Sequence, residues 1–524
     1  MKNKYWADNL IEGLDKTVHH RVDDMKTPSG HAHAGSMRAI ATHALIYEAM
    51  KHAGFDVEFS YVVNDMDPMD GLPVYLDKTT YEPHMGKPLY LIPPPDGKSS
   101  NYAEQYANEY IGAFNTLNFF PEIVWSSKLY QSGVMDKWIR MALDGAEEIR
   151  KIYLKVAEQK KPEGWFPLQV ICPKCQKVGS SLVTEWDGVA VAFECKKDLV
   201  NWAVGCGEKG KISPFGGTSK LMWKIDWPAH WAELNITVEG AGKDHLSAGG
   251  SHDIATEVAK KVFKKNPPFA FLHEFFLIGG AKMSSSKGNA TTAAQLVQIV
   301  PPELCKFLFV RTPYQRAFNF NPGVADTIPD LFDEYDTCAK SWIENGDTTK
   351  QGRMYEASQT TPLTREKVFL PRFRVVAQLV QGSIQNPTEY FEKQKGSKLT
   401  ETESKILEER VLYAKLWLKH FASQDNVFEV SDSVPEEVST LTDEQTAFLK
   451  TLAQMLDEGS FADAATVQTA LFEKIKESGL ASKDAFTAIY IALSGKTQGP
   501  KAGLVLFSEL QENKDRLLSR LVIK

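Results

Sequence analysis

The sequence predicts a parallel α/β core in the first half of the chain and an all-α region in the second half. Three observations support this fold class. Strand and helix patterns alternate along residues 37–278, a segment from Trp165 to about Thr218 interrupts the alternation, and helical patterns dominate from Thr292 onward. Strands that alternate with helices imply a parallel sheet covered on both faces.

The elements of the first half follow from the spacing of apolar residues. Apolar positions such as Ile40, Leu45 and Ala49 recur at helical spacing, and Gly54 is placed to end that helix. Helices are expected at 37–52, 101–117, 135–158 and 253–264. Alternating or short apolar runs predict strands at 57–63, 123–125, 234–238 and 269–278.

The second half carries few strand signals. Helices are expected at 293–300, 303–310, 366–381, 402–420, 444–457, 462–478 and 482–493. The Pro-, Thr- and Ser-containing stretch 351–364 is expected to be a linker or loop. The expected domains are 1–164 and 219–290 for the two halves of the core, 165–218 for the insertion, 291–350 for a helical connection and 351–524 for the remaining helices.

Composition indicates a soluble protein of three or four domains. The chain has 524 residues, of which 43% are hydrophobic and 24% charged, and it has no apolar run long enough to span a bilayer. The polar start, Met1 to Leu14, lacks a secretory apolar stretch, so a cytoplasmic location is expected. The net charge of −7 counts mildly against a nucleic-acid binder but leaves room for a local basic face. Six cysteines are no disulfide framework, and clustered cysteines in a reducing compartment more often bind metal.

The first motif is Thr27-Pro28-Ser29-Gly30-His31-Ala32-His33-Ala34-Gly35-Ser36, directly before a strong helix. Its small residues allow another group to approach the backbone closely, and a helix N-terminus attracts phosphate through its free N–H groups. Two histidines add donors for phosphate oxygens. The alternative is a glycine-capped helix with surface histidines.

The second motif is Lys282-Met283-Ser284-Ser285-Ser286-Lys287-Gly288-Asn289, which follows an apolar strand pattern. Lysines and hydroxyls on a loop of small residues suit a triphosphate that is gripped and then released as pyrophosphate. The alternative is a polar surface loop, which becomes less attractive when the two motifs are considered together.

Together the motifs resemble the two signatures of class I aminoacyl-tRNA synthetases. His33-Ala34-Gly35-Ser36 stands for the first signature and Lys282-Met283-Ser284-Ser285-Ser286 for the second. Ser36 replaces the second His or Asn of the first signature, and Ala34 replaces a larger aliphatic residue. Ser285 replaces the second lysine of the other, and Lys287 is its expected substitute.

Further segments narrow the resemblance to the class I lysyl-tRNA synthetases, over about residues 1–320. These segments are Pro28-Ser29-Gly30, Asn64 to Pro68, Trp223-Lys224-Ile225-Asp226-Trp227-Pro228, Gly242-Lys243-Asp244-His245, Gly249-Gly250-Ser251 and Lys282 to Asn289. The resemblance implies a Rossmann-like catalytic domain and ATP- and Mg²⁺-dependent ligation of L-lysine to tRNA(Lys) through lysyl-adenylate, with release of AMP and pyrophosphate. It also implies that 291–350 contacts the tRNA stem and that 351–524 binds the anticodon region.

The resemblance also implies roles for individual residues. The expected catalytic residues are His31, His33, Lys282 and Lys287. The expected ATP-binding residues are Ser29, Gly30, Gly35, Gly242, Asp244, His245, Ser284 and Ser285. The expected substrate-binding residues are Thr27, Asp65, Trp223, Asp226 and Trp227. A lysine ammonium needs a carboxylate or an aromatic face, but the sequence does not assign one: Asp67 is a further candidate, the tryptophans suit core packing, and Asp226 equally suits a helix N-cap.

Cys172, Cys175, Cys195 and Cys206 are expected to hold one structural zinc ion in the insertion. The alternatives are a redox-active pair at Cys172 and Cys175, or unligated thiols. A second metal cluster of the resembled family aligns with Pro94, Lys98, Ser99 and Gln105, which are poor zinc ligands, so that site is expected to be absent.

Two other functions stay open on the sequence. One is a class I synthetase for another amino acid, with glutamate the nearest case, whose side-chain pocket would need an arginine. The other is a non-charging tRNA-binding paralogue, which the altered signatures leave possible. Tyr390, Phe391, Lys393 and Lys395 are candidates for RNA contacts, against a solvated helix face with core aromatics. No membrane partner is expected, and the chain is expected to be a monomer.

Overall fold

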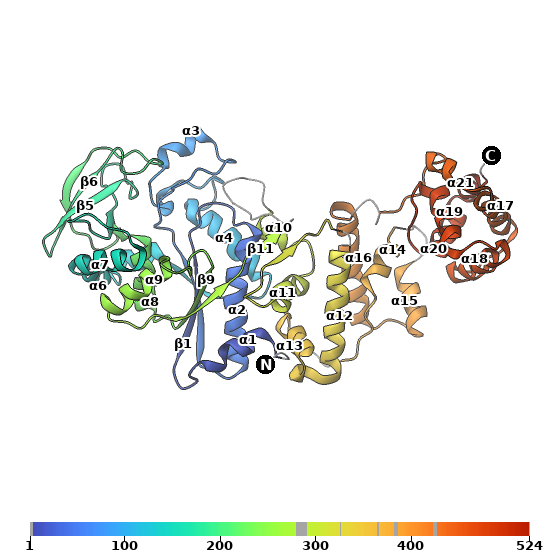
Figure 1. Cartoon of the computed structure of the whole chain (residues 1–524), viewed down its shortest axis with the longest axis horizontal. Coiled ribbons are helices and arrows are strands. Elements are labelled where there is room, and N and C mark those ends of the chain that lie inside the picture. Colours follow the sequence, from blue (N-terminus) through green and yellow to red (C-terminus); the bar gives the residue numbers. More distant parts are fainter. Residues whose placement is uncertain are drawn as a thin grey trace. The chain divides into compact units, whose positions relative to one another are not determined.

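The chain divides into two compact units, which are described separately (Figure 1). The first unit is Met1–Gln298, Cys305–Phe320 and Asn345–Leu363, and the second is Ile299–Leu304, Asn321–Glu344 and Thr364–Lys524. The computed structural model describes residues 4–278, 291–324, 326–363, 366–381, 386–422 and 427–522. Within those ranges, no helix is both long enough and apolar enough to cross a bilayer.

A five-stranded parallel sheet, in the order β10-β9-β1-β2-β3, forms the centre of the first unit. The strands are β1 (His20–Lys26), β2 (Val57–Val63), β3 (Glu122–Trp125), β9 (Val238–Gly242) and β10 (Phe269–His273). The predicted parallel sheet is therefore confirmed. The sequence patterns miss β1, because its residues include two adjacent aspartates that interrupt any apolar alternation.

Helices cover both faces of this sheet, as predicted. Helix α2 (Met37–His52) packs across β1, β2, β9 and β10, and its His43 lies 3.8 Å from Asp24. The next residue, Met25, points to the opposite face. There it packs with a cluster from α8 (Trp223–Leu234), α9 (Ser251–Lys261) and β9.

The first unit contains further helices, some within the predicted ranges and some that the sequence did not predict. Helix α4 (Tyr102–Asn115) lies within the predicted range 101–117 and begins after Asn101, whose Oδ1 accepts a hydrogen bond from the Glu104 N–H at 2.9 Å. The other helices are α1 (Trp6–Leu10), α3 (Lys78–Tyr81), α5 (Ser126–Gln131), α10 (Ala293–Leu296), α11 (Pro302–Arg311) and α13 (Lys350–Ala357). Helix α13 occupies part of the stretch 351–364, so the predicted linker is wrong there.

Three predicted elements of the core are wrong in their bounds. The predicted helix 135–158 is two helices, α6 (Asp136–Asp144) and α7 (Ala146–Ala157), which meet at Gly145. A Cβ on Gly145 would lie 2.9 Å from the Val262 side chain, so the close packing requires glycine. The predicted strand 234–238 is the end of α8, and Asn235 takes a left-handed conformation before β9. The predicted strand 269–278 is split between β10 and β11 (Phe276–Ile278), which pairs with β12 (Phe318–Phe320) in a separate sheet.

The insertion is a small antiparallel module. Its base is closed by β4 (Leu168–Val170), which pairs with β8 (Ser219–Leu221). Its body is a three-stranded sheet of β5 (Ser181–Trp186), β6 (Val191–Cys195) and β7 (Lys209–Ile212). Backbone hydrogen bonds from Val178 and Gly179 to the Gly86 carbonyl, at 2.8 and 3.0 Å, dock the module on the segment that follows β2.

The regular elements described after residue 327 are helices, in agreement with the predicted all-α region. Those of the second unit are α12 (Thr327–Asn345), α14 (Phe373–Leu379), α15 (Pro387–Lys395), α16 (Glu401–His420), α17 (Asp443–Glu458), α18 (Ala464–Ser478), α19 (Ser482–Ser494), α20 (Ala502–Glu512) and α21 (Lys514–Leu521). The predicted helix 366–381 is shorter than expected, because α14 begins only after Pro371. Helices α17 to α21 share one apolar core.

A buried ion pair in this unit gives a stability prediction. The Arg410 guanidinium donates to both carboxylate oxygens of Asp336, at 2.8 and 2.5 Å, and both side chains are largely buried. Arg410→Met leaves the Asp336 charge without this partner, so we expect the free energy of unfolding of the second unit to fall by about 3–5 kcal/mol. Denaturant titration measures the change.

The matched control is Arg372→Met, which breaks an ion pair of the same kind to Asp333 at 2.7 Å. The Arg372 side chain is 60% exposed, so its loss is expected to cost less than about 1 kcal/mol. Equal effects of the two substitutions would contradict the assignment of Arg410 as a buried structural partner.

Candidate active site

A cavity of about 830 Å³ opens at the carboxyl ends of β1 and β9. This is where ligands bind in parallel α/β sheets, because the loops that follow the strands diverge there. The cavity is lined by the end of β1, the first motif, the segment after β2, the start of α8 and the segment after β9. The first motif and the segment after β9 therefore meet at one site.

The first motif lies between β1 and α2 and forms one wall of this cavity. Thr27, Ser29, His33 and Gly35 line it. Gly30 has a φ of +154°, and a Cβ there would lie 2.5 Å from the Tyr75 hydroxyl oxygen, so this turn requires glycine. The motif is arranged for close backbone approach, as its small residues predict.

The second motif lies outside the described residues, and with it lie Lys282, Ser284, Ser285 and Lys287. The chain immediately after it is placed beside the first motif. The Ala34 N–H donates to the Thr291 carbonyl and the Ala293 N–H to the Ala32 carbonyl, each at 2.8 Å. The backbone thus brings residues 291–293 next to the histidine motif.

His31, unlike His33, is absent from the cavity lining. Its Nδ1 lies 2.6 Å from a Glu109 carboxylate oxygen, and its ring lies against those of Tyr75 and Tyr106, with centroids 4.7 and 5.0 Å apart. Glu109, which the sequence reasoning missed, therefore orients His31.

A buried carboxylate that the sequence reasoning missed faces the cavity from β9. Glu239 is 4% exposed. Trp227 Nε1 donates to its two oxygens at 3.0 and 3.1 Å, and Trp231 Nε1 also donates to it. Burial raises the pKa of Glu239 to about 8. The two tryptophans thus orient a carboxylate as well as packing in the core.

A second buried carboxylate lies beside the first. Asp23 on β1 is in register with Glu239 on β9 and is fully buried. Burial and, next, the charge of Glu239 raise the pKa of Asp23 well above its ordinary value. Ser60 donates to Asp23, but no ion pair joins either carboxylate to a cation among the described residues. Two acidic groups without a protein cation create a local demand for positive charge.

Asp226 is already paired within the protein. The Lys220 ammonium lies 2.8 Å from Asp226 Oδ2 and 2.9 Å from Asp67 Oδ1, and the Tyr130 hydroxyl donates to Asp226 Oδ1 at 2.5 Å. Thr27 donates to the other oxygen of Asp67. The N-cap alternative for Asp226 is wrong, since Met222 takes that position on α8. Lys220 was not singled out from the sequence, because it lies just before the segment Trp223 to Pro228 and outside it.

The structure gives Asp65 a role away from the cavity lining. Its Oδ1 accepts a hydrogen bond from the Ser127 N–H at 2.7 Å, and its Oδ2 accepts one from the Ser127 hydroxyl. Ser127 lies in the first turn of α5. A carboxylate at that place satisfies free N–H groups and favours the helix dipole, so Asp65 stabilises the start of α5.

Residues expected to bind ATP form the opposite side of the cavity, after β9. Gly242, Asp244 and His245 line it together with Trp223. A Cβ on Gly242 would lie 2.7 Å from Asp244 Oδ1, so glycine allows that carboxylate to fold back over the strand end. The Trp223 ring stacks on Trp227 with centroids 5.8 Å apart and meets the His245 ring edge-on at 5.6 Å. Trp223 is 43% exposed and offers an aromatic face.

The four cysteines of the insertion converge. Their sulfur atoms all lie within 4.8 Å of one another, and the Cys172–Cys206 and Cys175–Cys195 pairs are each 3.6 Å apart. These separations are far too long for a disulfide bond and suit four thiolates about 2.3 Å from a tetrahedral metal ion. The cluster fits a metal.

The residues aligned with the second metal cluster help to form a turn. The Ser99 hydroxyl donates to Asp96 Oδ2 at 2.8 Å. Gln105 Oε1 accepts a hydrogen bond from the Asp96 N–H at 2.8 Å. Pro94 and Lys98 belong to the same turn, in which the Gly97 N–H donates to the Pro94 carbonyl.

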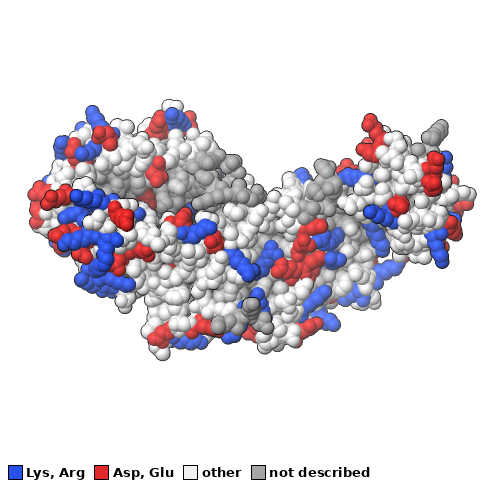
Figure 2. All heavy atoms as spheres, in the orientation of Figure 1, with Lys and Arg blue, Asp and Glu red and all other residues white. Residues whose placement is uncertain are grey.

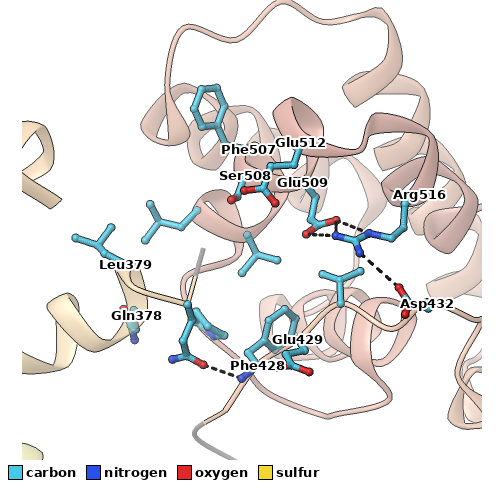
Figure 3. A pocket seen from close by; sticks show the side chains of 15 residues that line it. Gln378, Leu379, Phe428, Glu429, Asp432, Phe507, Ser508, Glu509, Glu512 and Arg516 are labelled. Carbon is cyan, nitrogen blue, oxygen red and sulfur yellow. Dashed lines mark hydrogen bonds and ion pairs between the residues drawn. The ribbon is translucent and has the colours of Figure 1, made fainter. Parts of the chain in front are cut away.

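A cavity of about 330 Å³ in the second unit is acidic (Figure 3). Glu429, Asp432, Glu509 and Glu512 line it, and its single arginine, Arg516, is paired with Glu509 at 2.7 Å. Such a lining disfavours phosphate groups. This cavity therefore does not suit an RNA backbone.

The residues of α15 that were candidates for RNA contacts are largely occupied by contacts within the protein. Phe391 is buried, which agrees with the alternative of a core aromatic and not with stacking on RNA. Lys393 pairs with Asp463, and Lys395 lies 2.5 Å from Glu403. Tyr390 is half-buried.

Comparison with known proteins agrees with this arrangement. The family model described as tRNA synthetases class I (K) matches residues 4–361, and the model described as anticodon binding domain matches residues 389–521. The lysine–tRNA ligase 1 of Methanosarcina acetivorans is 31% identical over 530 residues, which cover 96% of each chain. The lysine–tRNA ligase of Archaeoglobus fulgidus is 30% identical over 506 residues, covering 96% of this chain and 97% of that one.

A solved glutamate tRNA ligase from Elizabethkingia meningosepticum aligns over 96% of this chain and 98% of its own, with a TM-score of 0.45 and 12% identity. The family match covers well over half of the chain, and the matched segment contains the whole cavity. The chain therefore belongs to the class I (K) family of tRNA synthetases.

Proposed function

We propose that the chain ligates L-lysine to tRNA(Lys) in an ATP-dependent reaction that passes through lysyl-adenylate. The observation that carries the choice of lysine is the buried carboxylate Glu239, which faces the cavity beside Asp23. The side-chain ammonium of lysine supplies the positive charge that these two groups demand. The curated relatives named as lysine–tRNA ligases support the same choice.

The charges of the cavity separate lysine from glutamate as substrate. A glutamate side chain would need an arginine guanidinium at the inner end of its pocket. No arginine stands among the described residues that line the cavity. Lys220, which lies near the inner carboxylates, is already shared between Asp67 and Asp226.

The geometry supports a specific placement of the substrate. The ammonium of lysine lies against Glu239, which Trp227 and Trp231 hold in position by their indole N–H groups. Trp223 and Trp227 offer aromatic faces to the methylene chain and the charge. Thr27 and Asp226 act through the Lys220 cluster, which shapes the pocket, and Asp65 acts further back by holding α5.

The proposed reaction has two steps, adenylate formation and transfer of the lysyl group to the tRNA, and the protein mainly positions the reactants. The lysine carboxylate attacks the α-phosphorus of ATP, the bond to pyrophosphate breaks, and lysyl-adenylate forms. The terminal ribose hydroxyl of the tRNA then attacks the adenylate carbonyl, and AMP leaves. Mg²⁺, when bound to ATP, neutralises phosphate charge. Positioning and charge stabilisation account for catalysis of this kind.

Residues of the two motifs are proposed to hold ATP. His33, with Ser29, Gly30 and Gly35, meets the phosphates, and His31 supports this wall through Glu109. Gly242, Asp244 and His245 hold the adenosine, and Ser284, Ser285, Lys282 and Lys287 receive the departing pyrophosphate. The helical region 389–521 is proposed to bind the anticodon end of the tRNA. We also propose that the chain is a cytoplasmic monomer.

Zinc is the proposed metal of the cysteine cluster. Four thiolates at tetrahedral spacing favour Zn²⁺ in a reducing compartment. When bound, the ion ties the strand end at Cys195 to the loops that carry Cys172, Cys175 and Cys206. Its role is structural, because the four protein ligands leave no open position.

The amino-acid specificity is tested by ATP–pyrophosphate exchange with each of the twenty amino acids, in the presence of total tRNA. We expect lysine alone to stimulate exchange. Stimulation by glutamate in its place would refute the proposed substrate, and no exchange with any amino acid, together with retained tRNA binding, would favour a non-charging paralogue.

Glu239→Gln tests the ammonium site. We expect kcat/KM for lysine to fall about a hundredfold, since the ion pair to the substrate is lost. The matched control is Asp70→Asn, which neutralises an exposed carboxylate of the same cavity and should change kcat/KM less than about twofold.

The pH dependence of lysine binding gives an independent check on Glu239. With a pKa near 8, Glu239 is largely protonated at pH 7 and must lose its proton to receive the ammonium. Lysine affinity should therefore rise between about pH 6.5 and 8.5 in the natural chain. The same titration should be flat in Glu239→Gln, and an identical rise in both proteins would exclude Glu239 as its source.

Metal analysis tests the cysteine cluster. We expect one zinc ion per chain, and Cys195→Ser should lose it and lower the melting temperature, because Cys195 is a buried ligand on β6. Cys338→Ser is the control, since Cys338 is buried elsewhere and has no part in the cluster. Two zinc ions per chain would contradict the predicted loss of the second site.

A further inference from the structure

Two lysines on the cavity wall lie close together without an acidic partner. Lys161 follows α7, and Lys224 lies in the first turn of α8; both line the cavity and both are half-buried. Their ammonium groups lie over the same ring, that of Tyr153, at 4.5 and 6.0 Å from its centroid. No ion pair to either lysine is found among the described residues.

This arrangement is unfavourable unless an anion is present. Two like charges over one ring repel each other, and burial and the charge of Lys224 lower the pKa of Lys161. The face of Tyr153 attracts both cations but does not neutralise them. The buried lysine of the same wall is paired within the protein: Lys220 is held by Asp67 and Asp226. The difference points to a ligand that supplies negative charge.

The start of α8 adds a second feature that favours an anion. The helix has 12 residues, and Met222 at its N-cap position supplies no side-chain acceptor to the first turn. Met222, Trp223 and Lys224 all line the cavity. The positive end of the helix dipole therefore lies on the same wall as the two ammonium groups.

We propose that Lys161 and Lys224 form a phosphate-binding site that takes the backbone of the single-stranded 3′ end of the tRNA. The inference rests on the proposed function, in which that end must reach the adenylate in this cavity. ATP is the other source of phosphate. The first motif, between β1 and α2, and the lysines of the second motif are the groups assigned to the triphosphate, and Lys161 and Lys224 come from neither segment.

The surroundings match single-stranded RNA better than a free phosphate ion. Trp202 of the insertion lines the same cavity and is half-buried. Lysines that follow a backbone beside aromatic faces for the bases are the usual elements of single-strand binding. Trp202 lies on the loop between Cys195 and Cys206, so the wide spacing of these two cysteines leaves room for a loop that reaches the cavity.

A basic surface continues beyond the cavity on the same unit. Lys and Arg side chains gather, with some acidic ones among them, over the region of α6, α7 and α9 (Figure 2). Exposed lysines there are Lys151, Lys155, Lys260, Lys264 and Lys265. Such a surface attracts a polyanion toward the wall even though the whole chain carries a net charge of −7.

The test compares tRNA binding by the natural chain, Lys161→Gln, Lys224→Gln and the double variant. Each protein is titrated with full-length tRNA(Lys) and with the same tRNA lacking its unpaired 3′ nucleotides. We expect the double variant to bind full-length tRNA about tenfold more weakly. The slope of log affinity against log salt should fall by about 1.4, the value for two phosphate contacts on a single strand. Truncated tRNA should bind equally to all four proteins.

Lys160→Gln is the matched control, because Lys160 is the exposed neighbour of Lys161 and is absent from the cavity lining. It should bind both RNAs as the natural chain does. Equal weakening for full-length and truncated tRNA would overturn the proposal, as would unchanged binding of both. A raised KM for ATP with unchanged tRNA affinity would assign the lysines to the nucleotide.

The proposed function is judged separately, on the natural chain. Lysine-dependent charging of tRNA by that chain supports the function whatever the lysine variants do. If the natural chain charges tRNA and the variants bind normally, only the phosphate site is refuted.

Discussion

The Lys220 ammonium joins parts of the catalytic unit that are far apart in the sequence. It lies within 2.9 Å of both Asp67 and Asp226, and Thr27 and Tyr130 donate hydrogen bonds to the same two carboxylates. These residues come from the strand that closes the insertion, the segment after β2, α8, the first motif and α5. Removal of one partner from such a buried cluster costs roughly 3–5 kcal/mol. The carboxyl edge of the sheet therefore takes its shape from this one cation.

The same cation divides the acidic groups of the cavity into two kinds. Asp67 and Asp226 share the Lys220 ammonium, so both are already paired within the protein and help to shape the pocket. Glu239 and Asp23 have no ion pair to a cation among the described residues, and burial raises the pKa of both. A site that pairs its structural carboxylates within the protein and leaves one buried acidic pair without a cation favours a cationic side chain. The proposed specificity for lysine rests on this difference between the two pairs and not on the number of acidic residues.

The parallel sheet and the all-α second half could be predicted from periodicity, because helices α2 and α4 and strand β2 carry regular apolar patterns. The apolar pattern gave wrong element bounds where contacts between distant segments determine the backbone. The Asn235 turn separates α8 from β9, although Leu234 to Val238 is apolar enough for a strand. Gly145 splits one helical pattern into two helices, because Val262 leaves no space for a side chain. Strand β1 was missed because its two adjacent, buried aspartates interrupt the alternation of apolar residues.

The site itself was only partly predictable, for a related reason. Motifs identify residues that lie close together in the sequence, such as Ser29 to Gly35 and Gly242 to His245. They do not identify Glu239, Lys220 or Glu109, whose roles arise from partners that are distant along the chain. Cys195 and Cys206 were found only because cysteine is rare enough to be counted.

Charge changes sign along the wall of the cavity, and this ordering fits the order of the two reactions. The inner end, at β1 and β9, is acidic and is the proposed site of the amino acid. The wall at α8 and the segment after α7 is basic and is the proposed site of phosphate groups. In this arrangement the ammonium groups attract an anionic RNA end along the basic wall. Its terminal hydroxyl would then meet the adenylate carbonyl from that side, while the lysine side chain occupies the acidic pocket beyond it.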